Sequence, residues 1–170
     1  INFTSGPKWL YENILKDKKV IAVSGTHGKT TTTSMIVHIM AKNKLNPSYL
    51  IGGDPKGNTS SVKLTKSEYF VIEADEYDTA FFDKQSKFMH YNPYILLINN
   101  IEFDHADIFH DLKDIIKSFH NLLRLIPSDG RIIINKNDLN IKKLLKIGCW
   151  SKVISLDTKE INGDFNLIKG

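Results

Sequence analysis

The sequence contains very little cysteine and has no long apolar run. Cys149 is its single cysteine in 170 residues, so no disulfide can form within the chain. A fold without disulfides is typical of proteins in a reducing compartment, most simply the cytoplasm. No apolar run approaches the roughly 20 residues that cross a bilayer, and no signal peptide is visible. The sequence therefore predicts a cytoplasmic protein with no membrane partner.

A concentrated positive charge is also missing. The formal net charge is +4, and the basic residues are spread along the chain instead of forming one cluster. Nucleic-acid-binding domains usually carry a clustered basic surface, so we expect no nucleic-acid partner. With 41% hydrophobic and 25% charged residues, the composition is that of an ordinary globular domain with one core.

Apolar runs rich in β-branched residues alternate with helical patterns along the chain. The runs are residues 20–23, 69–72, 94–98 and 131–134, with shorter ones at 49–51 and 153–154. Helices are expected after Pro7 and over residues 30–42, 111–125 and 138–147. Continuous apolar strands that alternate with helices predict an α/β fold: a mostly parallel sheet with helices on both faces.

A phosphate-binding loop is predicted between the first strand and its helix. The segment reads Gly25-Thr26-His27-Gly28-Lys29-Thr30-Thr31, directly after the apolar run. Such a loop directs backbone N–H groups and the positive end of a helix dipole at a phosphate. In that arrangement Lys29 would reach the terminal phosphates and the Thr30 hydroxyl would bind Mg²⁺. The full pattern has a glycine where this chain has Val23, so the loop is a shortened variant of the P-loop NTPase type.

Polar residues follow two further strands. Glu73 ends one strand and is followed by three more acids, and His105 lies in an aspartate-containing segment after another. If the strands are parallel, these ends meet the phosphate loop at one edge of the sheet, where ligands bind. Glu73 is the best placed carboxylate for Mg²⁺, which prefers oxygen ligands. His105 could be a metal ligand, a general base or a surface residue.

Three segments together resemble a known family. Residues 25–31, Glu73-Ala74-Asp75-Glu76 and residues 100–105 resemble the ATP-dependent muramyl ligases of bacterial peptidoglycan synthesis. These enzymes join an amino acid or a peptide to the carboxylate of a UDP-linked muramic acid. The resemblance implies a domain that binds ATP and Mg²⁺, with two catalytic residues, Lys29 and His105. Nucleotide-binding residues implied by it are Gly25, Thr26, His27, Gly28, Lys29, Thr30, Thr31 and Asn100, and the implied metal ligands are Thr30, Glu73 and His105.

Finer features of the resemblance concern substrate and domains. Residues 76–109 are most similar to members that add an L-alanyl-γ-D-glutamyl-meso-diaminopimelate tripeptide to UDP-N-acetylmuramate; the alternative is an L-alanine-adding member. Some members carry a carbamylated lysine about fifteen residues after the histidine, where this chain has His120. Residues 1–18 would be an entry segment and residues 19–170 a partial central domain. Without the family's UDP-binding and C-terminal domains, we expect the chain alone to be inactive in ligation.

A GTP-binding switch protein is the alternative from another class. Asn135-Lys136-Asn137-Asp138 spells the guanine-reading pattern of GTPases, and it follows a predicted strand. The shortened phosphate loop, and the lack of an Asp-x-x-Gly segment after a strand, favour the ligase interpretation.

Overall fold

The computed structural model describes residues 3–53, 60–80, 82–103 and 109–157. Its centre is a seven-stranded sheet in the order β3-β2-β4-β1-β7-β8-β9. Neighbouring strands pair in parallel throughout, except for β3, which is antiparallel to β2 at one edge. The strands are β1 (Lys19–Ser24), β2 (Ser48–Leu50), β3 (Val62–Lys63), β4 (Tyr69–Glu73), β7 (Ile95–Ile98), β8 (Arg131–Asn135) and β9 (Lys152–Leu156). The predicted mostly parallel sheet is thus confirmed.

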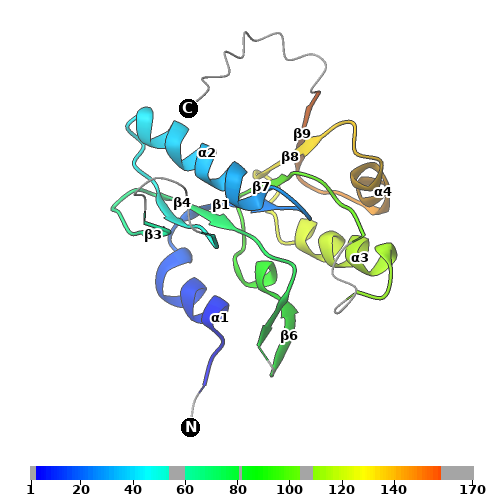
Figure 1. Ribbon diagram of the computed structural model, residues 1–170, viewed down its shortest axis with the longest axis horizontal. Coiled ribbons are helices and arrows are strands. Elements are labelled where there is room, and N and C mark those ends of the chain that lie inside the picture. Colours follow the sequence, from blue (N-terminus) through cyan, green and yellow to red (C-terminus); the bar gives the residue numbers. More distant parts are fainter. Residues whose placement is uncertain (1–2, 54–59, 81, 104–108, 158–170) are drawn as a thin grey trace.

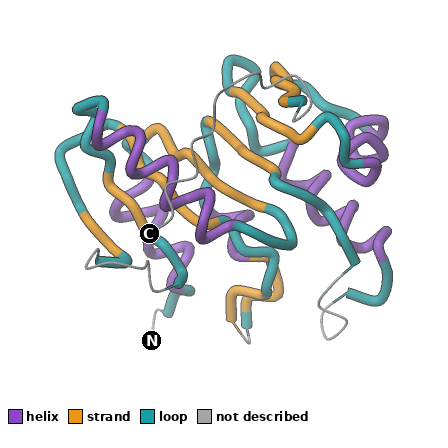
Figure 2. The backbone as a smooth tube through the Cα atoms, turned by 45° about the horizontal axis from the view of Figure 1, so that its top comes forward, coloured by secondary structure: helices purple, strands orange, loops and turns teal. Residues whose placement is uncertain are grey.

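Helices cover both faces of this sheet, as Figures 1 and 2 show. On one face α2 (Lys29–Lys42) packs on alternate strand residues, among them Ile21 and Val71. The other face carries the larger core, in which the intervening residues Ala22 and Ile72 are fully buried. The elements on that side are α1 (Gly6–Leu10), the π-helical turn η1 (Tyr11–Leu15), the 3₁₀ turn η2 (Lys87–His90), α3 (Leu112–Leu123) and α4 (Leu139–Ile147). The predicted α/β class with helices on both faces is confirmed.

Strand β1 lies between β4 and β7 in the sheet, and this order indicates where a ligand would bind. After β1 the chain passes through α2 to β2, on one side, whereas β7 pairs with β1 on its other side. In open parallel sheets the connections diverge at such a point and leave a crevice at the carboxyl ends of the strands. The ends of β1, β4 and β7 therefore meet at one edge of the sheet, as the sequence predicted.

A small hairpin follows β4 and was not predicted from the sequence. It consists of β5 (Asp78–Ala80) and β6 (Asp83–Ser86), and Figure 1 shows it projecting away from the sheet. The N-terminal segment is attached to it: Ser5 Oγ donates to Asp83 Oδ2 at 2.9 Å. The Phe3 and Phe82 rings also meet edge to face, with centroids 4.9 Å apart. Both hairpin strands are short and polar, so the apolar alternation that reveals strands is missing.

No helix in the described ranges combines the length and the apolarity that crossing a bilayer requires.

Candidate nucleotide-binding site

The loop between β1 and α2 needs glycine at two positions. Gly25 has φ +133°, and a Cβ there would lie 3.0 Å from the Asn100 carbonyl oxygen. Gly28 immediately precedes α2 with φ +77°, a left-handed conformation that other residues rarely adopt. The two glycines allow the chain to turn sharply from the end of β1 into the first turn of α2.

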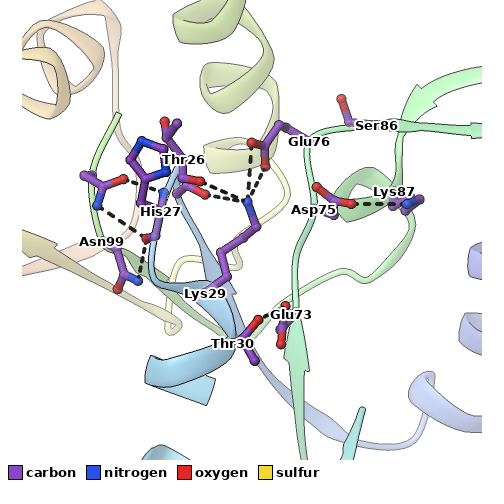
Figure 3. A network of polar contacts seen from close by, with 12 residues as sticks. Thr26, His27, Lys29, Thr30, Glu73, Asp75, Glu76, Ser86, Lys87 and Asn99 are labelled. Atoms are coloured by element: carbon purple, nitrogen blue, oxygen red, sulfur yellow. Dashed lines mark hydrogen bonds and ion pairs between the residues drawn. The ribbon is translucent and has the colours of Figure 1, made fainter. Parts of the chain in front are cut away.

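Two asparagines that follow β7 hold this loop in place. The His27 backbone N–H donates to Asn100 Oδ1 at 2.9 Å, and Asn100 Nδ2 donates back to the His27 carbonyl at 3.3 Å. Asn99 Nδ2 donates to the same carbonyl at 3.2 Å and to Thr32 Oγ1 at 3.0 Å. Thr26 Oγ1 accepts from the Glu102 N–H at 2.9 Å. The loop is therefore fastened to the neighbouring strand end, and Figure 3 shows Asn99 and the contacts of His27 as dashed lines.

The first turn of α2 presents free backbone donors to the crevice. The helical hydrogen bonds begin with the Thr32 N–H, which donates to the Gly28 carbonyl at 3.0 Å, and no side chain caps the helix. Within the described ranges, the N–H groups of Lys29, Thr30 and Thr31 have no hydrogen-bond partner. Together with the positive end of the helix dipole, such donors favour an anion.

The ammonium group of Lys29 lies across the mouth of the loop. Lys29 Nζ donates to the Gly25 carbonyl at 2.8 Å and approaches the Glu76 carboxylate to 3.1 Å. The Glu76 side chain is only 3% exposed and that of Lys29 is 15% exposed. This ion pair joins the phosphate loop to the segment after β4 (Figure 3).

Thr30 and Glu73 meet as the sequence predicted. Thr30 Oγ1 donates to Glu73 Oε2 at 3.2 Å, and Glu73 Oε1 accepts from the Gly52 N–H at 3.0 Å. A hydroxyl and a carboxylate at a phosphate loop are the oxygen ligands that suit Mg²⁺, which takes its remaining ligands from phosphates and water. The donor set therefore fits the predicted ion. Three-residue clusters of His, Cys, Asp and Glu that could hold a metal are not found in the described ranges.

Lysines neutralise the other acids after β4. Besides the Lys29–Glu76 pair, Lys87 Nζ lies 3.1 Å from Asp75 Oδ2, and Lys84 Nζ lies 3.6 Å from Asp78 Oδ2. The sequence showed four acids in this segment and singled out Glu73 as the best placed for Mg²⁺. The structure places lysines beside three of the four acids and leaves Glu73 as the carboxylate at the Thr30 hydroxyl.

A cavity of about 440 Å³ lies beside this site, between the β5–β6 hairpin and α3. Glu76 is one of its lining residues, and in Figure 3 Glu76 stands between Lys29 and Ser86, which also lines the cavity. Most of the other lining groups are polar or charged, including Lys117 and Asn121 of α3. The cavity therefore offers a polar space next to the phosphate loop.

Two histidines were singled out in the sequence: His105 as a predicted metal ligand and catalytic residue, and His120 as the residue at the position of a carbamylated lysine in some family members. His105 lies outside the described residues, so its predicted roles stay predictions. His120 packs against Trp150, with ring centroids 5.6 Å apart, and lines a pocket between α3 and α4. It is not among the residues that line the cavity beside Glu76. The described side-chain contacts of His120 are thus with Trp150 and the pocket between α3 and α4, and none of them is with a residue of the phosphate loop.

Both carboxylate oxygens of Asp138, the last residue of the guanine-reading pattern, accept hydrogen bonds from backbone N–H groups. One of its carboxylate oxygens accepts from the Asn140 and Ile141 N–H groups, which caps α4, and the other accepts from the Ile101 N–H at 3.0 Å. Asn140 Nδ2 also donates to the Ile101 carbonyl. The aspartate of the Asn-Lys-Asn-Asp pattern thus caps α4 and holds the segment that follows β7.

Two features of the site were not predicted from the sequence. One is the contact of Asn99 with the loop, and the other is the buried ion pair of Glu76 with Lys29. Asn99 could have been suspected, since it stands beside Asn100 at a strand end. The Lys29–Glu76 pair joins residues 47 positions apart, and no local pattern signals it. The predicted nucleotide contact of Asn100 stays a prediction, because its observed contacts are with the loop itself.

A parallel sheet with a glycine loop, a lysine and a threonine at its central strand defines a nucleotide-binding domain of the P-loop type. Comparison with known proteins gives the particular family. Residues 23–167 match the model of the Mur ligase middle domain, and the chain belongs to the Mur ligase family.

Two curated relatives are similar over most of this chain. The UDP-N-acetylmuramate–L-alanyl-γ-D-glutamyl-meso-2,6-diaminoheptandioate ligase of Escherichia coli K12 is 54% identical over 152 residues, 89% of this chain and 33% of the relative. The enzyme of the same name from Haemophilus influenzae is 53% identical over 152 residues, 89% of this chain and 34% of the relative. The chain thus spans about one third of the length of the curated relatives that it matches.

A solved structure supports the same assignment. The crystal structure of the UDP-N-acetylmuramate:L-alanyl-γ-D-glutamyl-meso-diaminopimelate ligase from Neisseria meningitidis is 48% identical, with a TM-score of 0.86. The match covers 91% of this chain and 51% of that one.

Proposed function

We propose that this chain is the ATP-binding part of a ligase that joins the carboxylate of UDP-N-acetylmuramate to the amine of an L-alanyl-γ-D-glutamyl-meso-diaminopimelate tripeptide. The observation that carries the proposal is the loop at the end of β1, where unpartnered helix N–H groups, Lys29 and Thr30 converge. The names of the relatives at 53% and 54% identity supply the two substrates. Such a ligase would serve peptidoglycan recycling in the cytoplasm.

The proposed reaction has two steps. A carboxylate oxygen of the muramate attacks the γ-phosphorus of ATP, the bond to the bridging oxygen breaks, and ADP leaves. The tripeptide amine then attacks the carbonyl carbon of the acyl phosphate, loses a proton, and displaces phosphate. Phosphoryl transfer of this kind depends chiefly on positioning and on neutralising the charge of the phosphates.

Residues of this chain have assignable tasks in the first step. The first-turn N–H groups of α2 bind phosphate oxygens, and Lys29 places its positive charge at the transferring phosphoryl group. Thr30 Oγ1 and the Glu73 carboxylate would hold Mg²⁺, which would supply further positive charge at the phosphates. Asn99 and Asn100 keep the loop in shape through His27. His105 stays proposed as a catalytic residue and metal ligand.

Domain organisation belongs to the same proposal. Residues 1–18 would lead in from a preceding domain and residues 19–170 would form part of the central domain. Because the relatives are about three times as long, the muramate and the tripeptide would be bound largely by segments beyond this chain. We therefore expect the chain alone to bind nucleotide but not to catalyse ligation.

The test begins with the chain itself. Calorimetric titration with Mg-ATP and Mg-GTP should show binding with a clear preference for ATP, and a preference for GTP would overturn the proposal. The protein that carries this chain at full length is then assayed with UDP-N-acetylmuramate, ATP, and either L-alanine or the tripeptide. The tripeptide should give product; product formed only with L-alanine would favour the alanine-adding alternative. Lys29→Ala should abolish turnover.

A further inference from the structure

The ion pair between Lys29 and Glu76 lies where the terminal phosphates of a nucleotide would be bound. Lys29 Nζ contacts both carboxylate oxygens of Glu76, at 3.1 and 3.4 Å. Its remaining contacts are with carbonyl oxygens of the loop, Gly25 at 2.8 Å and Thr26 at 3.5 Å. All of these partners are oxygens with negative or partial negative charge, which a phosphate would also provide.

The pair is too well buried to be an ordinary surface salt bridge. Surface pairs contribute little because water screens both charges and the side chains are mobile. Here the Glu76 side chain is 3% exposed and the Lys29 side chain is 15% exposed, so water screens this pair only weakly. Moving Lys29 from Glu76 to a phosphate therefore has a free-energy cost that nucleotide binding must offset.

The neighbouring ion pair of Asp75 is more exposed and does not involve the phosphate loop. Asp75 is only two positions from Glu73 and is paired with Lys87, and its side chain is 30% exposed. Lys87 belongs to the η2 turn and not to the phosphate loop. Of the acids after β4, Glu76 is the one whose described partner is the phosphate-loop lysine.

The cavity gives Glu76 a route to solvent once Lys29 leaves. Glu76 lines the space of about 440 Å³ between the β5–β6 hairpin and α3. Rotation of the Glu76 side chain towards this cavity would bring its carboxylate to water once Lys29 has moved to a phosphate. Exchange of the lysine is thus physically feasible without rearranging the sheet.

We propose that Glu76 is the positioning residue of Lys29: it holds the ammonium group across the phosphate loop, and the nucleotide's terminal phosphate replaces it as the lysine's partner. Binding of nucleotide is then a competition between Glu76 and phosphate for one cation. This inference rests on the proposed function, because it takes Lys29 to contact phosphate.

The test is a double-mutant cycle on this chain, with the dissociation constants of Mg-ATP and Mg-ADP measured by calorimetry. Glu76→Gln keeps the shape of the side chain and removes its charge, so it should bind Mg-ATP about tenfold more tightly than the wild type. In the Lys29→Met background the same substitution should change affinity by less than about twofold, because no lysine remains to be released.

Asp75→Asn is the matched control, since it removes a neighbouring negative charge that is paired with another lysine. It should leave the affinity for Mg-ATP within about twofold of the wild type. The inference would be overturned if Asp75→Asn tightened Mg-ATP binding as strongly as Glu76→Gln does, because any lost negative charge would then suffice. It would also be overturned if Glu76→Gln tightened binding as strongly in the Lys29→Met background as in the wild type. Unchanged or weakened binding in Glu76→Gln would overturn it too.

The fold of each variant is checked by circular dichroism and thermal unfolding. If Glu76→Gln does not fold, Glu76→Asp replaces it in the cycle; its shorter side chain draws the carboxylate away from Lys29, and about threefold tighter binding is expected. Failure of the inference is distinguishable from failure of the proposed function. A folded wild type that does not bind Mg-ATP contradicts the function, whereas binding that Lys29→Met weakens and Glu76→Gln does not improve contradicts only the inference.

Discussion

Thr30 Oγ1 lies 3.2 Å from Glu73 Oε2, so the first turn of α2 and the end of β4 share one hydrogen bond at the mouth of the phosphate loop. Because a hydroxyl and a carboxylate this close can both bind one Mg²⁺, Thr30→Val should remove a metal ligand while keeping the shape of the side chain. We expect Mg-ATP to bind about tenfold more weakly, as measured by calorimetry.

The same titration in excess EDTA is the control for the Thr30→Val prediction. Without Mg²⁺ the variant and the wild type should bind ATP with similar affinity, because the backbone N–H groups of α2 are unchanged. An equal loss of affinity with and without Mg²⁺ would show that Thr30 acts on the loop and not through the metal.

Asn100→Ala should loosen the phosphate loop. The substitution leaves the His27 N–H without its acceptor and removes a donor to the His27 carbonyl. Since a loop that is not held in shape must be ordered by the ligand, we expect nucleotide affinity to fall about fivefold to thirtyfold. Hydrogen exchange of the loop amides should also become faster.

Asn43→Ala is the matched control for Asn100→Ala, because Asn43 Nδ2 donates to the Ile39 carbonyl at the opposite end of α2. Affinity and loop exchange should stay at wild-type values in this variant. Slower or unchanged hydrogen exchange of the loop amides in Asn100→Ala would show that Asn100 does not hold the loop in shape.

The alternation of the parallel strands and helices could be predicted because it follows from local patterns, whereas the polar β5–β6 hairpin could not. The apolar run at 20–23, the glycines at 25 and 28, and the helical spacing of 30–42 all act within a few residues of each other, and β1 and α2 form there. Thr30 and Glu73 were predicted to meet because parallel strands place their carboxyl ends at one edge.

What the sequence did not show depends on contacts between distant residues. The Lys29–Glu76 pair, and the attachment of Ser5 to Asp83 over 78 positions, arise only when separate elements pack together. His120 was noted only for its distance in sequence from His105, and Asp138 only for completing a four-residue pattern. The register of α3 turns His120 towards Trp150, and the capping of α4 occupies the Asp138 carboxylate, so tertiary packing decided both.

Asp138→Ala should lower stability without changing nucleotide preference. The carboxylate caps α4 and accepts from the Ile101 N–H, so its removal leaves three backbone donors without an acceptor. The free energy of unfolding should fall by about 1–3 kcal/mol, as measured by urea denaturation. The ratio of ATP to GTP affinity should stay unchanged.

Asp138→Asn separates capping from charge in the same experiment. Asparagine is also a good N-cap, so this variant should lose less stability than Asp138→Ala. A change in base preference in either variant would support the guanine-reading alternative instead.

Asp83→Asn should destabilise the attachment of the N-terminal segment in a pH-dependent way. Burial alone would raise the pKa of Asp83, but hydrogen bonds from Ser5 and from the Gln85 N–H, together with His90, outweigh it and lower the pKa below the ordinary 3.8. The ionised carboxylate therefore stabilises the fold above the unfolded pKa, and this contribution is lost as the pH falls through the lower folded-state pKa. Near neutral pH the variant should lose about 1–2 kcal/mol of unfolding free energy.

Acidification distinguishes this charge effect from simple loss of packing. The difference in unfolding free energy between the wild type and Asp83→Asn should shrink below about pH 4, where Asp83 takes up its proton in the unfolded chain before it does so in the folded protein. Asp129→Asn serves as control: Asp129 accepts only an exposed bond from the Tyr94 hydroxyl among its described side-chain contacts, so less than about 0.5 kcal/mol should be lost. A difference for Asp83→Asn that persists unchanged into acid would mean that its carboxylate charge does not hold the N-terminal segment on the hairpin.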